Sequence, residues 1–322
     1  MKKLIFIFVC LFCTYEYTQG QQIHQLTQYT LNDFVFNPAV AGSVNEKIVT
    51  RATYRRQWAG IFDGAEPTTM LISAHSNVYS NNMGLGLMVY NDKTGPNKSL
   101  GIQLSYAYHI PLNNNEENPT KLSLGISGQL LQRSIDVNEL NAYDANDPQA
   151  LANNSQFNGD ANFGAYLYNK KYFVGVSALQ LIQSKYQLTE ANTTSITDAM
   201  HVYITGGYKL RLTEDIDLQP TTILKYVEND ALGFEVNARG FYRDMYWAGL
   251  GYRNADAISL LLGVDLENGL SVGYSYDLIT SELNSVSRAG SHELSIGYSF
   301  DGDFAVKKEK PFDLNKKLPK DL

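Results

Sequence analysis

Between residues 47 and 300, this chain repeats one pattern, in which short runs of alternating apolar and polar residues are separated by turns. The apolar positions of one such run are Leu100, Ile102, Leu104, Tyr106 and Tyr108. A period of two places these positions on one face of a β-strand and the residues between them on the other face. Other runs likewise carry Leu, Ile, Val and Tyr on one face and Gly, Ser, Gln, Glu and Arg on the other. The pattern predicts an all-β fold, a transmembrane antiparallel β-barrel of the outer-membrane type, with lipid outside and a polar lumen inside.

The runs and the turns between them predict about 14 strands, and a count of twelve or sixteen fits the same rhythm. The strands are expected near residues 47–58, 67–77, 83–91, 99–110, 121–133, 160–168, 171–180, 201–211, 215–227, 231–242, 245–253, 256–266, 269–278 and 291–300. From the fifth strand on, short connections follow the even strands, and the long ones (134–159, 181–200 and 279–290) follow odd strands. Outer-membrane barrels have short periplasmic turns and longer outer loops. This parity, with an even strand count, predicts that both termini are periplasmic.

The first twenty residues have the features of an export signal. Lys2 and Lys3 precede an apolar stretch, residues 4–13, that is too short to span a bilayer. We predict a signal peptide over residues 1–20, and a lipoprotein processed at Cys13 is the alternative. Both cysteines lie inside this segment, so the mature chain would have no thiol, which excludes thiolate zinc sites and thiol catalysis.

Four regions are predicted from these features: residues 1–20 as the signal peptide, 21–46 as an N-terminal motif segment, 47–300 as the barrel and 301–322 as a flexible periplasmic tail. No other segment has the 18 to 20 continuous apolar residues of a membrane helix. The formal net charge of −7 argues against nucleic acid as a partner. The five histidines are scattered without metal-ligand spacing, and no cofactor is expected.

The chain has 22 tyrosines, many of them near predicted strand ends. They include Tyr106, Tyr108, Tyr166, Tyr168, Tyr274, Tyr276 and Tyr298. We interpret these as an aromatic girdle at the membrane interface, with the ring in the headgroup region and the hydroxyl in water. The alternative is the general preference of Tyr for strands.

The most distinctive motifs lie before and within the first two strands. They are Thr27-Gln28-Tyr29, Asn37-Pro38-Ala39-Val40-Ala41-Gly42-Ser43, Arg55-Arg56-Gln57-Trp58, a loop with Phe62, Gly64 and Pro67, and Ser73-Ala74-His75. Asn-Pro and Ala-Gly-Ser set turns, here just before the barrel begins. The third motif and the loop after it are expected around a barrel mouth.

Taken in order, these motifs resemble those of the PorP/SprF family of the type IX secretion system in Bacteroidetes. The specific resemblance covers about residues 21–90, with two departures: Val40 stands where the family often has an aromatic residue, and Glu66 is inserted before Pro67. The resemblance implies an outer-membrane barrel that supports secretion or surface attachment of proteins with a type IX C-terminal signal domain, such as gliding adhesins. It also implies contact with outer-membrane lipid and association with the periplasmic ring and lipoprotein components of the apparatus.

The motif residues are the candidates for a functional site. They are Gln28, Tyr29, Asn37, Pro38, Gly42, Arg55, Gln57 and Trp58. Their role is either structural, in closing the barrel and anchoring a plug, or direct contact with a partner. We expect the segment over residues 21–43 to fold back into the lumen as a plug and make the barrel non-conducting.

Charged residues on the faces expected to point inward form a second set. They are Glu235, Arg239, Asp265, Asp277 and Glu293. Charges at lumen positions either pair across the barrel or line a path, and we expect pairing.

Two other classes of function remain as alternatives. A barrel enzyme needs a nucleophile and base; Ser73 and His75 lie two residues apart on one face, but no Gly-x-Ser-x-Gly motif occurs. We therefore predict no enzymatic activity. The second alternative is a passive outer-membrane channel for small or hydrophobic solutes.

Overall fold

A computed structural model of the chain describes residues 23–44, 47–60, 64–78, 82–113, 115, 118–136, 155–186, 196–227, 232–282 and 289–301. The predicted signal peptide and C-terminal tail lie outside the described residues. Among the described residues, no helix combines the length and the apolar character needed to cross a membrane.

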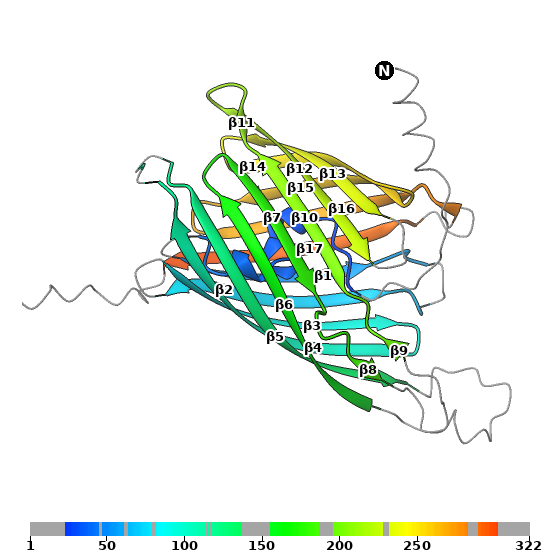
Figure 1. Ribbon diagram of the computed structural model, residues 1–322. Helices are drawn as coiled ribbons and strands as arrows, with labels where there is room; N and C mark the ends of the chain where they lie inside the picture. Colours follow the sequence, from blue (N-terminus) through cyan, green and yellow to red (C-terminus); the bar gives the residue numbers. More distant parts are fainter. Residues whose placement is uncertain are drawn as a thin grey trace, which may run out of the picture.

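The described strands form one antiparallel barrel (Figure 1). Its strands are β1 (Lys47–Arg56), β2 (Thr68–Val78), β3 (Met83–Thr94), β4 (Asn97–Pro111), β5 (Lys121–Ile135), β6 (Ser155–Tyr168), β7 (Tyr172–Leu179), β10 (His201–Tyr208), β11 (Leu210–Arg211), β12 (Ile216–Val227), β13 (Gly233–Tyr242), β14 (Tyr246–Arg253), β15 (Ala257–Asp265), β16 (Leu270–Ile279) and β17 (Ser291–Asp301). Strands that follow one another in the sequence lie side by side, β7 pairs with β10, and β1 pairs with β17. Both β10 and β11 pair with β12. Because β10 and β11 share one position, these 15 described strands make the predicted 14-strand closed barrel. A separate hairpin joins β8 (Lys185–Tyr186) to β9 (Ile196–Thr197).

The two mouths of the barrel differ in their connections. β1 begins and β17 ends at one mouth, together with the connections over residues 79–82, 112–120, 169–171, 212–215, 243–245 and 266–269. We call this the short-turn mouth. The connections at the other mouth cover residues 57–67, 95–96, 136–154, 180–200, 228–232, 254–256 and 280–290, and we call it the long-loop mouth.

Side chains alternate across the wall as the sequence predicts. Leu104 is 65% exposed on the outer face, and its neighbour Ser105 is 4% exposed on the inner face. Among the tyrosines predicted to form the aromatic girdle, four are exposed: Tyr106, Tyr108, Tyr274 and Tyr298. The predicted outward position is wrong for Tyr166 and Tyr168. Tyr166 is buried and donates to Asp33 Oδ2, and the Tyr168 hydroxyl lies 3.1 Å from His109 Nδ1. Period-two alternation assigns these two tyrosines to the inner face, where the hydroxyl has partners.

One pair of strands extends further than expected. β5 continues to Ile135 and β6 begins at Ser155, where the sequence predicted a loop over residues 134–159. Gln132 pairs with Phe157 in this extension. Over residues 155–159 of β6, Phe157 is the one large apolar side chain on the outer face, so the alternation there is too weak to indicate a strand although the backbone ladder continues.

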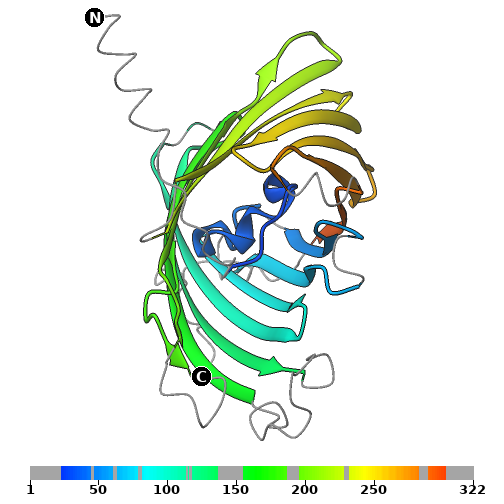
Figure 2. The same ribbon diagram turned by 90° about the vertical axis from the view of Figure 1, so that its right-hand side faces the viewer.

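The segment before β1 lies inside the ring of strands, where Figure 2 shows it in blue. We call residues 23–44 the lumenal segment; it contains three short 3₁₀ turns, η1 (Tyr29–Leu31), η2 (Asp33–Val35) and η3 (Pro38–Val40). Its apolar side chains make up much of the hydrophobic core inside the barrel. The wall is shaped to admit it: a Cβ at Gly84 would lie 1.8 Å from Ala41 O, and one at Gly125 would lie 2.3 Å from Ala39 N. Glycine is therefore required at these two positions of the wall.

Candidate functional site

Five charged side chains from five strands form one buried group, which we call the lumenal network. They are Arg55 (β1), Glu235 (β13), Arg253 (β14), Asp277 (β16) and Glu293 (β17), and each is at most 5% exposed. Arg55 Nη2 lies 2.9 Å from Asp277 Oδ2, and its Nη1 lies 3.1 Å from Glu293 Oε2. Arg253 Nε lies 2.7 Å from Glu235 Oε2, and its Nη1 lies 3.1 Å from Asp277 Oδ2. Because Asp277 contacts both arginines, the ion pairs act as one unit.

Thr27 of the lumenal segment lies at the centre of this network. Its hydroxyl donates to Asp277, with Oδ2 at 2.8 Å, and accepts from Arg55 Nη1 and Arg253 Nη2, each at 2.7 Å. One donated and two accepted bonds use the full capacity of a hydroxyl. The network therefore binds the segment with a specific geometry as well as with charge.

Glu293 binds the same part of the segment through its backbone. Its carboxylate accepts from the N–H of Thr27 at 2.7 Å and from the N–H of Gln28 at 2.9 Å. Gln28 Nε2 also donates to the Glu293 carbonyl at 3.2 Å. Bonds with one charged partner are about twice as strong as neutral ones.

The Asn-Pro and Ala-Gly elements shape the other half of the segment. Asn37 Oδ1 accepts from Ala39 N at 2.9 Å, which caps η3, and Asn37 Nδ2 donates to the Ala165 carbonyl of β6 at 3.0 Å. Pro38 occupies the first position of η3, where its fixed φ suits the turn and its missing N–H costs nothing. Gly42 has a φ of +73° and its N–H donates to His75 Nδ1 at 3.2 Å. These three residues thus fix the segment against the wall.

Gln57 and Trp58 lie at the long-loop mouth, just after β1. Gln57 N donates to Pro67 O at 2.8 Å, and Trp58 N donates to Ser291 Oγ at 3.0 Å. Glu66, the residue inserted relative to the family pattern, forms an ion pair with Arg56. Backbone N–H groups and the Arg56 guanidinium hold the pKa of the Glu66 carboxyl below its usual value. These contacts therefore hold residues 57–58 and 66–67 to each other and to β1 and β17.

The remaining candidates lie apart from the network. The Tyr29 hydroxyl is 3.0 Å from Thr221 Oγ1. Arg239 donates from Nη2 to Gln219 Oε1 at 2.8 Å, and its guanidinium carbon lies 5.3 Å from the ring centroids of both Phe241 and Trp247. Asp265 is partly exposed at the short-turn end of β15. The structure thus brings Gln28, Arg55, Glu235, Asp277 and Glu293 together but not Arg239 or Asp265.

Several contact residues were missed from the sequence. Arg253 and Thr27 are central to the network, and Arg253 follows the inward positions of its strand, so the alternation could have identified it. Ser73 and His75, considered above as a catalytic pair, contact the lumenal segment instead: Ser73 Oγ is 3.0 Å from Asn32 Nδ2. Among the described residues, no group of three or more His, Cys, Asp or Glu is arranged to hold a metal ion.

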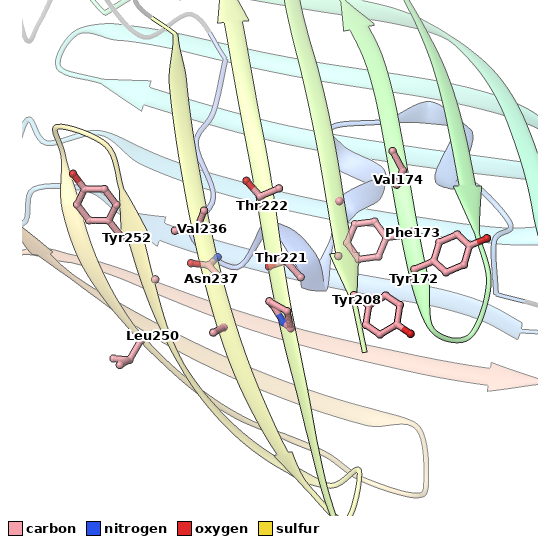
Figure 3. A pocket seen from close by; sticks show the side chains of 15 residues that line it. Tyr172, Phe173, Val174, Tyr208, Thr221, Thr222, Val236, Asn237, Leu250 and Tyr252 are labelled. Carbon is pink, nitrogen blue, oxygen red and sulfur yellow. The ribbon is translucent and has the colours of Figure 1, made fainter. Parts of the chain in front are cut away.

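The outer wall carries an apolar groove of about 910 Å³ (Figure 3). It crosses β7, β10, β12, β13 and β14, and its lining includes Gly206, Tyr208, Ala238, Leu250 and Tyr252. A polar cavity of about 380 Å³ lies inside, beside Asp33 and Arg51. Neither is lined by a member of the lumenal network.

Comparison with known proteins gives one family and a set of distant folds. The family model described as "Type IX secretion system membrane protein PorP/SprF" matches residues 18–298. No curated protein matches the sequence. Similar solved structures include a Pseudomonas aeruginosa FadL homologue (9% identity, 82% of this chain and 92% of that chain, TM-score 0.46). They also include Omp33 of Acinetobacter baumannii (8% identity, 80% and 97% coverage, TM-score 0.40) and the NanC porin (12% identity, 79% and 98% coverage, TM-score 0.38).

Proposed function

This chain belongs to the PorP/SprF family of type IX secretion system membrane proteins, and from that premise we propose that it is a non-enzymatic component of that system. It supports the secretion or surface attachment of proteins with a type IX C-terminal signal domain, such as gliding adhesins. The observation that carries the proposal is the family match over residues 18–298, which covers nearly all of the barrel.

The filled lumen favours a scaffold over a pore. The lumenal segment lies inside the ring of strands, where Thr27 and Gln28 are bound to buried charges and Phe34 is completely buried. Free passage of a polypeptide would require this segment to leave. The barrel therefore holds its partners through its mouths and loops, while its outer face contacts outer-membrane lipid.

The unequal mouths suggest an orientation. Because outer-membrane barrels have short periplasmic turns and longer outer loops, the short-turn mouth faces the periplasm. The tail after Asp301 then begins on the periplasmic side, within reach of the ring and lipoprotein components. The long-loop mouth faces the cell surface, where a secreted adhesin would be held.

Affinity purification tests this role. The chain, tagged after Leu322, is isolated from detergent-solubilised outer membranes, and the proteins that accompany it are identified by mass spectrometry. A large secreted protein with a type IX C-terminal domain supports an anchor for cargo, and ring or lipoprotein components support a place in the apparatus. Recovery of neither, with an equally tagged unrelated barrel as control, would contradict the proposal and leave the solute channel as the function to test.

A further inference from the structure

We propose that the two ends of the mature chain leave the barrel by opposite mouths: the lumenal segment runs from the short-turn mouth, where it joins β1, to the long-loop mouth, where Ile23 emerges. The carboxyl end leaves by the short-turn mouth after Asp301. This placement of the amino end replaces the expectation that both termini share one side. The placement of the two ends at opposite mouths is independent of the proposed function. Only the assignment of each mouth to the periplasm or the cell surface rests on that function.

The start of the segment lies at the long-loop mouth. His24 Nδ1 is 3.4 Å from Asp92 Oδ2, and the His24 ring centroid is 4.9 Å from that of Tyr90. Asp92 is near the end of β3 (Met83–Thr94), which reaches the long-loop mouth. Glu293, which binds Thr27 and Gln28, is near the start of β17 at the same mouth.

The segment then proceeds down the lumen. Asn32 contacts Ser73 and the Phe34 ring centroid is 5.3 Å from that of His75, and both partners lie progressively further along β2 from the long-loop mouth. The path is not straight, because the Phe36 ring centroid lies 6.4 Å from that of His24 and 5.2 Å from that of Tyr203, near the start of β10 at the long-loop mouth. The segment therefore folds back at Phe36 before Ala41 and Gly42 reach the short-turn mouth, and its two ends lie toward opposite mouths.

The end of the segment lies at the short-turn mouth. Ala41 O is 2.9 Å from His109 Nε2, and a Cβ on Gly42 would approach Asn77 Cα to 3.0 Å. His109 and Asn77 are each near the ends of β4 and β2 at this mouth, and β1 begins there at Lys47. Figure 1 shows this blue segment between the two mouths.

Chain length excludes a return of Ile23 to the short-turn mouth. Thr27 is held by the lumenal network, and four residues span at most about 14 Å when fully extended. The ten residues of β1 span about 33 Å at ~3.3 Å each. Strands tilted by about 35–45° shorten this to about 25 Å along the barrel axis, and Arg55, which binds Thr27, is near the long-loop end of β1. Ile23 therefore cannot return to the short-turn mouth.

The consequence is that the two tails of one small barrel reach different compartments. With the long loops outside, the amino end is presented at the cell surface among the loops that would hold cargo. The carboxyl tail is presented in the periplasm, where it can meet the ring and lipoprotein components. The barrel thus offers each side its own attachment point, and nothing needs to pass through the lumen.

Cysteine labelling tests the inference in the full chain. The mature chain would contain no cysteine, because both cysteines lie within residues 1–20, so single substitutions report single positions. Ile23→Cys is compared with Asn254→Cys, an exposed reference at the long-loop mouth, and with Glu267→Cys, an exposed reference at the short-turn mouth. Intact and permeabilised cells are treated with a polyethylene-glycol maleimide too large to pass through porins. Gln25→Cys repeats the measurement if Ile23→Cys fails to assemble.

We expect Ile23→Cys to react under the same conditions as Asn254→Cys and unlike Glu267→Cys. Reaction together with Glu267→Cys would overturn the inference, as would a cysteine at residue 23 that stays unreactive in permeabilised cells while both references react. If Ile23→Cys follows Asn254→Cys but both react only after permeabilisation, the opposite-mouth inference holds and the proposed orientation is wrong.

Discussion

At the scale of single residues, the hydroxyl of Thr27 connects the lumenal segment to the charged wall. It contacts Asp277, Arg55 and Arg253, and all four side chains are buried. A buried charge that loses its partner keeps the full cost of its desolvation. The geometry of the segment and the electrostatics of the barrel are therefore coupled at this residue.

Replacing Thr27 with Val should destabilise the barrel by about 1–3 kcal/mol, because Asp277 and two guanidinium groups lose a bonding partner while the side-chain volume stays the same. Unfolding in urea, followed by the fluorescence of the two tryptophans, measures the change. Thr27→Ser keeps the hydroxyl and serves as the control. Equal stability of the Val and Ser variants would contradict the role given to this hydroxyl.

Removing Arg253 should cost more, since Arg253→Met leaves Glu235 and Asp277 buried with fewer counter-charges. We expect a loss of about 3–5 kcal/mol. Arg243→Met is the matched control, because Arg243 pairs with Asp215 on an exposed turn, where such a pair contributes at most about 1 kcal/mol. The same urea titration compares the two variants, and similar losses in both would show that the lumenal network is not a stabilising unit.

At the scale of elements, period-two alternation determines which side of each strand faces lipid, and it is readable within one strand. The strand count and the outward position of Leu104 were therefore predictable. The β5–β6 extension was not, because residues 155–159 carry one large apolar outward side chain, Phe157, while the backbone pairing continues. The meeting of Arg55 with Arg253 and Asp277 was also out of reach, since it depends on how distant strands curve together in the closed barrel.

Close contact between wall and segment gives a prediction for β3. Gly84→Ala would place a Cβ 1.8 Å from Ala41 O, so segment or strand must shift, at a cost of about 1–3 kcal/mol or more. Gly128→Ala on β5 is the control, because a Cβ there meets nothing within 4 Å. The midpoint temperature of unfolding, measured by the loss of heat-modifiable migration on gels, should fall for Gly84→Ala and stay unchanged for Gly128→Ala. An unchanged Gly84→Ala barrel would mean that the segment does not touch this strand.

The lipid-facing register of β4 can be tested in the same way. Leu104→Arg should destabilise the inserted barrel by about 2–4 kcal/mol if this position lies at mid-bilayer. Leu112→Arg, exposed in the connection after β4, should cost about 0–1 kcal/mol near the interface. Folding into lipid vesicles under urea measures both variants. Equal insertion of Leu104→Arg and the unmodified chain would show that the assigned register is wrong.

At the scale of the whole molecule, two sets of interactions hold the barrel closed. The ladder between β1 and β17 joins the first strand to the last, and the lumenal network ties β1, β13, β14, β16 and β17 to Thr27 across that join. The lumenal segment thus lies inside this closed ring and is bound near both mouths.

If the lumenal segment closes the lumen and the barrel acts as a scaffold, as we propose, the complete protein should not conduct ions. Single-channel recording of the purified protein in planar bilayers tests this claim most directly, with a variant lacking residues 23–44 for comparison. We predict no steady conductance from the complete chain and a measurable conductance from any shortened variant that still inserts. A large, steady conductance from the complete chain would contradict the account.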